Sequence, residues 1–207
     1  MAVERYQDYV IKDGKLIGKF EDAYKEFDDP FGQTRKEVFE PTKALVLNAC
    51  ERIRSETKAN RIIELGCGFG DLAARLHAAN FEAHGADISA TAIAKAGQRH
   101  PGPAFHVNGF METALYDRIN PDIFIMSELS WYVLPQLKAF LEYLKENHRS
   151  KYLIHTICLY EKDDQKYGAE YFTTLEGILK YYALDYDEWA ESKTKHSGHR
   201  TFFVAQI

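Results

Sequence analysis

Residues 61–71, with the sequence RIIELGCGFGD, constrain the fold of this chain more than any other stretch. The run 61–65 is mostly apolar and indicates a buried parallel strand. Gly66, Gly68 and Gly70 then form a turn in which the backbone can approach a ligand closely. A helical pattern begins directly after the glycines. Strand, turn and helix together predict the opening unit of a nucleotide-binding α/β sheet.

The spacing of the glycines differs from that of the dinucleotide fingerprint, G-x-G-x-x-G. Gly70 comes one residue early, and Asp71 stands at the sixth position. The pattern is instead E-x-G-x-G-x-G, with Glu64 two residues before the first glycine. A carboxylate there suits a ligand with a cationic end better than a pyrophosphate. A tight turn without a ligand and a nicotinamide site are the alternatives.

This pattern resembles the first motif of the class I S-adenosylmethionine (SAM) methyltransferases, [DE]-x-G-x-G-x-G. The resemblance covers about residues 45–207. It implies that SAM is the cofactor and that S-adenosylhomocysteine is the product. It also implies that Glu64 and the turn residues Gly66, Cys67 and Gly68 hold the methionyl portion of SAM.

Beyond residue 60, extended and helical patterns alternate along the chain. We expect, in order, strand 61–65, helix 70–79, strand 82–87, helix 89–99, strand 104–108, helix 111–117, strand 122–127, helix 134–147, strand 151–158, helix 174–183, and two extended runs, 184–194 and 200–207. The turn sequence at 195–199 predicts that the last two runs form a hairpin. The expected fold is therefore α/β, with a Rossmann-like seven-stranded sheet, helices on both faces, and parallel strands except for a C-terminal antiparallel hairpin. Such a hairpin is typical of class I methyltransferases.

Residues 1–40 precede the alternating elements and show no strong strand pattern. A turn is predicted at 13–14, and aromatic residues at helical spacing predict a short helix over 20–28. A longer helix is expected over 41–57. We therefore divide the chain into an N-terminal arm or lid and a SAM-dependent methyltransferase domain, 41–207. The first segment is equally compatible with a lid and with an arm that packs against a sheet edge.

Further cofactor contacts are predicted at the ends of the second and third expected strands. By resemblance to the family, Asp87 accepts hydrogen bonds from both ribose hydroxyls, and Ile88 packs on the adenine. The alternative for Asp87 is a role at the start of the next helix. The family often places an acid after the third strand, whereas this chain has Asn108. The amide oxygen of Asn108 can accept from the adenine amino group, and the N–H of Phe110 or Met111 can meet a ring nitrogen. The alternative is that Asn108 lies in a surface turn without a ligand.

Candidate catalytic residues follow the fourth expected strand, because ligands in open α/β sheets sit beyond the carboxyl ends of the strands. This stretch resembles the S-E-V-x-x-Y-L sequence of many small-molecule methyltransferases. Within this stretch, we assign Ser127 to cofactor binding. Glu128 is the first candidate for a general base, and its alternative role is to cap the next helix. His155, on the fifth strand, and Tyr132 are the other candidates. A lone histidine on an apolar strand is more often a core residue.

The resemblance implies that a methyl group passes by in-line displacement to a nitrogen or oxygen of a small molecule, so alignment supplies much of the rate. Residues 28–31, Asp-Asp-Pro-Phe, resemble the Asp-Pro-Trp of nodulation-type N-methyltransferases that act on sugars. The acceptor class that we expect is therefore a small molecule such as a sugar or a natural-product intermediate. The alternative function is a SAM-binding partner or sensor protein without catalysis. The glycine spacing and the terminal hairpin disfavour a nicotinamide oxidoreductase.

Composition excludes several other classes of protein. The net charge is −5, and no block of lysine and arginine stands out, so we expect no nucleic-acid partner. No apolar run is long enough to span a membrane, and we expect a cytoplasmic protein. Cys50, Cys67 and Cys158 are too far apart for a metal-binding or disulfide pattern, so no metal is expected. The sequence does not indicate the oligomeric state.

Overall fold

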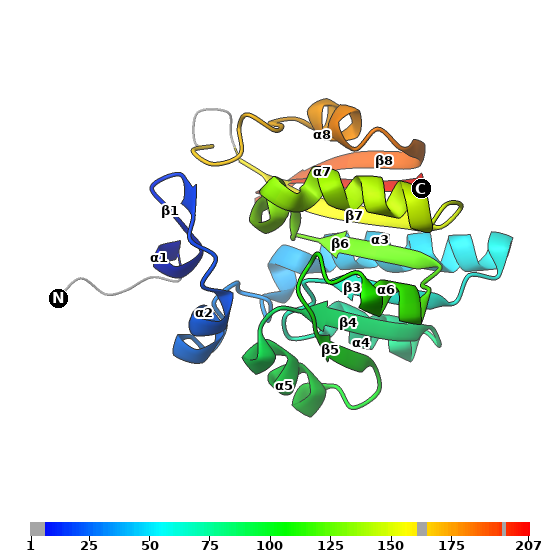
Figure 1. The fold of residues 1–207 in the computed structure, drawn as a ribbon, viewed down its shortest axis with the longest axis horizontal. Coiled ribbons are helices and arrows are strands. Elements are labelled where there is room, and N and C mark those ends of the chain that lie inside the picture. Colours follow the sequence, from blue (N-terminus) through cyan, green and yellow to red (C-terminus); the bar gives the residue numbers. More distant parts are fainter. Residues whose placement is uncertain (1–6, 161–164, 196–197) are drawn as a thin grey trace.

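A seven-stranded sheet forms the centre of the protein in a computed structural model that describes residues 7–160, 165–195 and 198–207 (Figure 1). Its strands are β3 (Arg61–Leu65), β4 (Glu82–Asp87), β5 (Ala104–Val107), β6 (Ile123–Ser127), β7 (Tyr152–Leu159), β8 (Asp185–Thr194) and β9 (Gly198–Gln206). They lie in the order β5-β4-β3-β6-β7-β9-β8. Neighbours from β5 to β7 pair in parallel, whereas β9 is antiparallel to both β7 and β8. The predicted α/β sheet with a C-terminal antiparallel hairpin is confirmed. Residues 196–197 of the expected hairpin turn lie outside the described residues.

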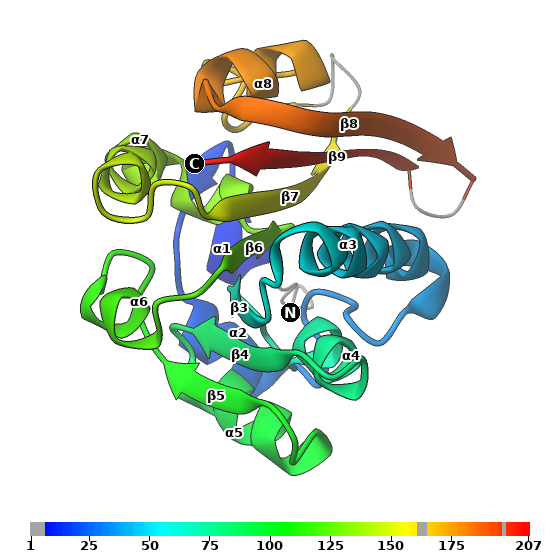
Figure 2. The ribbon, with the colours of Figure 1, turned by 90° about the vertical axis from the view of Figure 1, so that its right-hand side faces the viewer.

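Helices cover both faces of the sheet, as expected. They include α3 (Lys36–Thr57), α4 (Asp71–Ala78), α5 (Ala90–Arg99), α6 (Ala114–Ile119), α7 (Ser130–Asn147) and α8 (Leu175–Tyr182). Figure 2 shows α3 and α4 on one face, and α6 and α7 on the other. The side chains of Ile62 and Ile63 point to opposite faces and are both fully buried, one in each of two core clusters. This two-sided burial explains why β3 is apolar along most of its length.

The N-terminal segment forms small elements of its own beside the sheet (Figure 1). These are α1 (Gln7–Val10), a two-stranded hairpin of β1 (Ile11–Lys12) and β2 (Lys15–Leu16), and α2 (Phe20–Glu26). The hairpin turn lies at 13–14, as predicted, and both of its residues have positive φ. The helix predicted over 20–28 is present but ends at Glu26, two residues before the expected end.

Two helices begin earlier than expected. α3 begins at Lys36 instead of 41, and α7 begins at Ser130 instead of 134. Each contains a proline, Pro41 or Pro135, as its sixth residue, where the missing N–H removes a single intrahelical hydrogen bond. The predicted boundary between residues 40 and 41 therefore lies within a continuous helix. The early start of α7 places the residues just after Ser130 on a helix rather than in a loop.

None of the helices in the described part of the chain combines the length and the apolar character needed to cross a lipid bilayer.

Candidate active site

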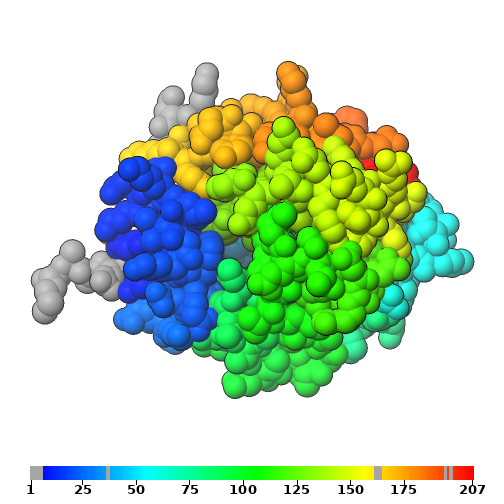
Figure 3. Space-filling view, in the orientation of Figure 1, coloured from blue at the N-terminus to red at the C-terminus, as the bar shows by residue number. Residues whose placement is uncertain are grey.

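A cavity of about 600 Å³ lies at the carboxyl ends of the parallel strands. This volume is within the usual range for small-molecule sites. Figure 3 shows a hollow at the surface between the N-terminal segment, in blue, and the green part of the chain. The predicted site residues that line the cavity are Glu64, Gly66, Cys67, Asp87, Ile88, Asn108, Phe110, Ser127, Glu128 and Tyr132. Gly68 and His155 are not among the lining residues.

The glycine turn has a backbone conformation that residues other than glycine adopt only with strain. Gly66 and Gly68 have φ values of +67° and +52°. A Cβ at Gly66 would lie 2.7 Å from Cδ1 of Leu129, and a Cβ at Gly68 would lie 2.2 Å from the amide nitrogen of Gln33. Gly68 is therefore covered by the N-terminal segment, which explains why it does not line the cavity.

Glu64 is buried at the end of β3, where its Oε2 accepts a hydrogen bond of 3.0 Å from the N–H of Ala73 in α4. Burial raises the pKa of Glu64 to about 8, although the nearby charge of Lys43 opposes this rise. A buried carboxyl group of this kind gains most when a cationic ligand group approaches and stabilises its ionised form. This is the property that the sequence motif predicts.

Asp87 is buried at the end of β4 and holds the turn in place. Its Oδ2 accepts from the N–H of Gly68 at 3.0 Å, and its Oδ1 accepts from the N–H of Ser89 at 2.9 Å. Burial raises the pKa of Asp87, and these hydrogen bonds oppose the rise. Each carboxylate oxygen keeps a further lone pair with which to accept from a ligand hydroxyl. The side chain of Ser89, rather than that of Asp87, caps α5 by accepting from Ala92 at 3.0 Å.

Asn108 anchors the turn after β5 through its amide nitrogen. Its Nδ2 donates to the carbonyl oxygen of Gly109 at 2.9 Å and to the hydroxyl of Tyr116 at 3.3 Å. The amide oxygen is then the part of this side chain that can accept from a ligand amino group. Ile88, which is 59% exposed, and Phe110 line the same part of the cavity.

Glu128 follows β6 with a φ of +59°, an uncommon conformation for a residue other than glycine. Its Oε2 accepts from the N–H of Cys158 at 2.9 Å, and its Oε1 forms an ion pair with the guanidinium of Arg200. Burial raises the pKa of Glu128, and the charge of Arg200 opposes this rise. The carboxylate does not cap α7. It therefore lines the cavity as half of an ion pair rather than as a separate base.

His155 lies in the core and is completely buried. Its Nε2 is 2.8 Å from the hydroxyl of Ser130, and its ring stacks on Phe203 at a centroid distance of 4.8 Å. Burial lowers the pKa of His155 to about 3. The structure therefore corrects its placement among the candidate bases and supports the alternative of a core residue, because a histidine held away from the cavity cannot reach a bound acceptor.

We expect the His155→Leu variant to bind S-adenosylhomocysteine within about twofold of the wild type, with a change of about 1–2 kcal/mol in the free energy of unfolding. The imidazole is lost from the core and not from the cavity. Calorimetric titration and denaturant unfolding measure the two quantities separately. An affinity loss above about tenfold in a variant that remains folded would restore His155 to the site.

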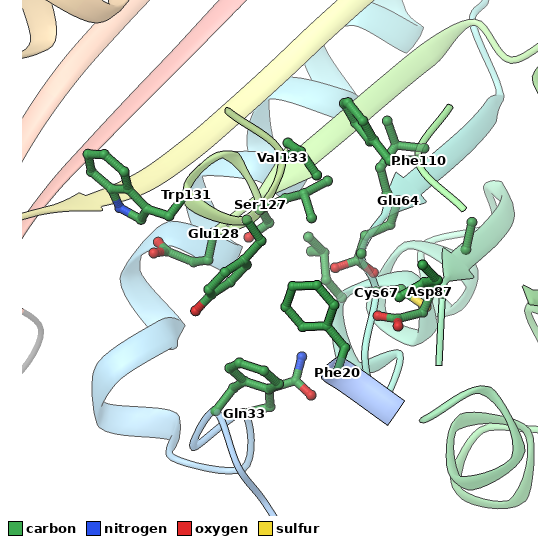
Figure 4. A pocket seen from close by; sticks show the side chains of 18 of the residues that line it. Phe20, Gln33, Glu64, Cys67, Asp87, Phe110, Ser127, Glu128, Trp131 and Val133 are labelled. Atoms are coloured by element: carbon green, nitrogen blue, oxygen red, sulfur yellow. The ribbon is translucent and has the colours of Figure 1, made fainter. Parts of the chain in front are cut away.

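The N-terminal segment contributes residues that sequence reasoning did not assign to the site. Phe20, Phe31 and Gln33 line the cavity, and Figure 4 shows the ring of Phe20 among the side chains of the site. The Oε1 of Gln33 accepts from the N–H of Phe69 in the glycine turn at 3.1 Å. The only sequence signal was the aromatic content of this segment, because contacts between distant parts of a chain leave no local pattern.

Glu21 attaches α2 to the start of α5. Its carboxylate accepts from the hydroxyl of Ser89 at 2.7 Å, and from the hydroxyl and the N–H of Thr91 at 2.8 Å and 3.1 Å. These donors, led by Ser89, lower the pKa of Glu21 to about 2. Since Ser89 also donates its N–H to Asp87, the N-terminal segment is connected directly to the predicted ribose contact.

Part of the chain matches a known protein family. Residues 62–150 match the family model described as a methyltransferase domain. Over this stretch the chain is similar to methyltransferase domains, in agreement with the resemblance of its glycine motif. A search of curated protein sequences found no match. In the described part of the chain, no group of three histidine, cysteine or acidic side chains is placed to hold a metal ion.

Solved structures of other proteins share the fold of this chain. The N-methyltransferase NodS from Bradyrhizobium japonicum, in complex with S-adenosylhomocysteine, has a TM-score of 0.65 at 14% identity, with 90% of this chain and 97% of that chain covered. The magnesium protoporphyrin IX methyltransferase of Synechocystis, with bound SAH, has a TM-score of 0.59 at 15% identity, with 84% and 87% covered. The PH0226 protein of Pyrococcus horikoshii has a TM-score of 0.59 at 16% identity, with 90% and 99% covered. At these identities the likeness concerns the fold.

Proposed function

We propose that this methyltransferase moves the methyl group of SAM to a nitrogen or oxygen of a small molecule held in the same cavity. The observation that carries the proposal is the convergence of Glu64, the glycine turn and Asp87 on one cavity. Two buried carboxyl groups at the ends of adjacent strands match a ligand with a cationic end and a pair of hydroxyl groups.

In this proposal, each part of SAM lies against a different group of residues in the cavity. Its α-ammonium group lies at Glu64, and its ribose hydroxyls donate to Asp87. The adenine lies against Ile88 and Phe110, and its amino group donates to the amide oxygen of Asn108. The backbone of Gly66, Cys67 and Gly68 lies along the methionyl portion, and Ser127 lies at the end of β6 beside it. These residues, apart from Gly68, line one continuous cavity.

The reaction that we propose depends mainly on alignment. The acceptor atom forms a bond to the methyl carbon while the bond from carbon to sulfur breaks, and the sulfur keeps the electron pair, which gives S-adenosylhomocysteine. The acceptor proton passes to solvent. Among the described residues, no histidine lines the cavity, and Glu128 is paired with Arg200. Glu128 and Tyr132 therefore orient the acceptor, and proximity supplies most of the rate.

The acceptor that we propose is a small molecule rather than a nucleic acid. The cavity is lined by apolar and acidic groups, with Lys43 and Arg200 as its cationic side chains among the described residues. A protein that binds a phosphate backbone usually presents many cationic groups along one face. The net charge of −5 agrees with this view.

We further propose that residues 7–35 act as a lid over the bound cofactor. The segment docks through Glu21 on α5 and through Gln33 on the glycine turn, and both contacts involve groups next to the predicted cofactor site. Release of S-adenosylhomocysteine would then require these contacts to open.

The Glu21→Gln variant should release S-adenosylhomocysteine about three- to tenfold faster than the wild type, because hydrogen bonds to a neutral acceptor are weaker than those to a carboxylate. Stopped-flow displacement measures this rate. Glu26→Gln, at an exposed position of the same helix, is the matched control and should leave the rate unchanged. An equal rate in both variants and the wild type would mean that the segment is a packing arm.

Methyl transfer itself is tested by incubating the protein with SAM labelled in its methyl group and a library of small-molecule amines, phenols and sugars. Transfer of label to at least one acceptor is the expected result. SAM binding without transfer to any member of a broad library would favour the alternative, a SAM-binding partner or sensor protein.

A further inference from the structure

Six aromatic rings line the cavity between the N-terminal segment and the start of α7. We call this set the ring chamber, and its members are Phe20, Phe31, Phe39, Trp131, Tyr132 and Tyr160. They come from the N-terminal segment, from α3, from the first turn of α7 and from the loop after β7. Elements far apart in the sequence therefore each place a ring at the same site.

Five of the six rings each contact another ring of the chamber. Tyr132 lies 5.5 Å from Phe20 and 5.7 Å from Phe31, measured between ring centroids, with the rings edge to face. Trp131 lies 5.8 Å from Tyr160. Figure 4 shows Trp131 on the side of Glu128, across the cavity from Asp87. A flat ligand among these rings would meet aromatic faces and edges at distances that favour stacking.

Two polar side chains beside the ring chamber, Glu128 and Gln33, already have protein partners. Glu128 accepts from Arg200 and from the N–H of Cys158. The amide oxygen of Gln33 accepts from the N–H of Phe69 at 3.1 Å and lies 3.4 Å from the hydroxyl of Tyr24. A sugar carries several hydroxyl groups, and each one that is buried without a partner costs free energy. The six rings of the chamber offer few such partners, which favours an aromatic acceptor over a polyol.

We propose that the acceptor is a planar aromatic or conjugated small molecule that stacks within the ring chamber, and this inference rests on the methyl transfer proposed above. It replaces the expectation of a sugar, which depended on residues 28–31. Of those residues, Phe31 contributes a ring to the chamber. Asp29 instead holds the local turn by accepting from the N–H groups of Gln33 and Thr34 at 2.8 Å and 2.9 Å.

Three probes of different character test the proposal by calorimetry, each with the free protein and with the protein saturated with S-adenosylhomocysteine. They are naphthol, its fully saturated analogue decahydronaphthol, and N-acetylglucosamine. We expect naphthol to bind at least about tenfold more tightly than decahydronaphthol, because only the flat ring system can stack. N-acetylglucosamine should show no saturable binding at the same concentrations.

Variants of the chamber locate the bound probe. Phe31→Leu and Tyr132→Leu should each weaken naphthol binding by about tenfold, because a ring contact is lost while an apolar side chain remains. Trp189→Leu is the control, because Trp189 is 57% exposed on β8 and does not line the cavity. Thermal unfolding of each variant shows whether the fold is retained.

Sugar binding that equals or exceeds naphthol binding would overturn the inference. It would also be overturned if the chamber variants bound naphthol as tightly as Trp189→Leu does. If S-adenosylhomocysteine binds and naphthol does not, the ring chamber proposal fails and the cofactor site stands. If naphthol binds in a manner that depends on Tyr132 while S-adenosylhomocysteine does not bind, the chamber stands and the proposed methyl transfer fails.

Discussion

Replacing Asp87 by asparagine should weaken the binding of S-adenosylhomocysteine by at least about 100-fold, because two hydrogen bonds to a charged acceptor are lost or weakened. In the wild type, one carboxylate oxygen accepts from Gly68 and the other from Ser89, and both have lone pairs for the ribose hydroxyls. An asparagine side chain has one amide oxygen that accepts and one amide nitrogen that donates. Its nitrogen would therefore face an N–H or hydroxyl group that also donates. The change therefore affects the ligand contact and the turn that carries it.

Calorimetric titration of Asp87→Asn measures this effect, and Asp22→Asn is the matched control. Asp22 is exposed on α2, so its substitution removes the same charge from the protein without touching the cavity. We expect the control to bind like the wild type. If Asp87→Asn also bound within about threefold of the wild type while remaining folded, Asp87 would not be the ribose ligand.

The affinity for S-adenosylhomocysteine should rise with pH up to about 8 and then level off. Burial gives Glu64 a pKa of about 8 in the free protein, so below this pH the group carries a proton that a cationic ligand group must displace. The ligand ammonium stabilises the ionised carboxylate and lowers its pKa in the complex. Between the two pKa values, affinity should fall by up to about tenfold for each pH unit of acidification.

Glu64→Gln tests the origin of this pH dependence. The variant keeps the shape of the side chain and an oxygen that can accept from Ala73, but it cannot ionise. It should bind more weakly than the wild type at pH 8, with an affinity that varies much less with pH. Any slope that remains reports the titration of other groups, such as the ligand and Asp87. A slope as steep as that of the wild type would show that Glu64 is not the titrating group.

The sequence was sufficient to predict the central sheet, because local patterns specify it. The apolar run of β3, the glycines that follow it and the acid at the end of β4 lie in short segments with regular spacing. Strict alternation of strands and helices then limits the topology to a parallel sheet, and the antiparallel hairpin of β8 and β9 has its own turn signal. The cavity at the carboxyl ends of the strands follows from this topology.

Contacts between distant segments were beyond sequence reasoning. Arg200 pairs with Glu128 across 72 positions of the chain, and Glu21 reaches Ser89 across 68. Neither pair has a spacing that a single sequence reveals. The burial of His155 was also undetermined, because the register of β7 and the packing of α7 and α8 decide which way its side chain points. Among these contacts, the one between Glu21 and Ser89 attaches the N-terminal segment beside the site.

Binding of SAM in the cavity is tested by titrating the purified protein with S-adenosylhomocysteine and, in parallel, with NAD. We expect micromolar binding of S-adenosylhomocysteine and no saturable binding of NAD. Binding of NAD in preference to S-adenosylhomocysteine would contradict the assignment of Glu64, the glycine turn and Asp87 to a methyl donor.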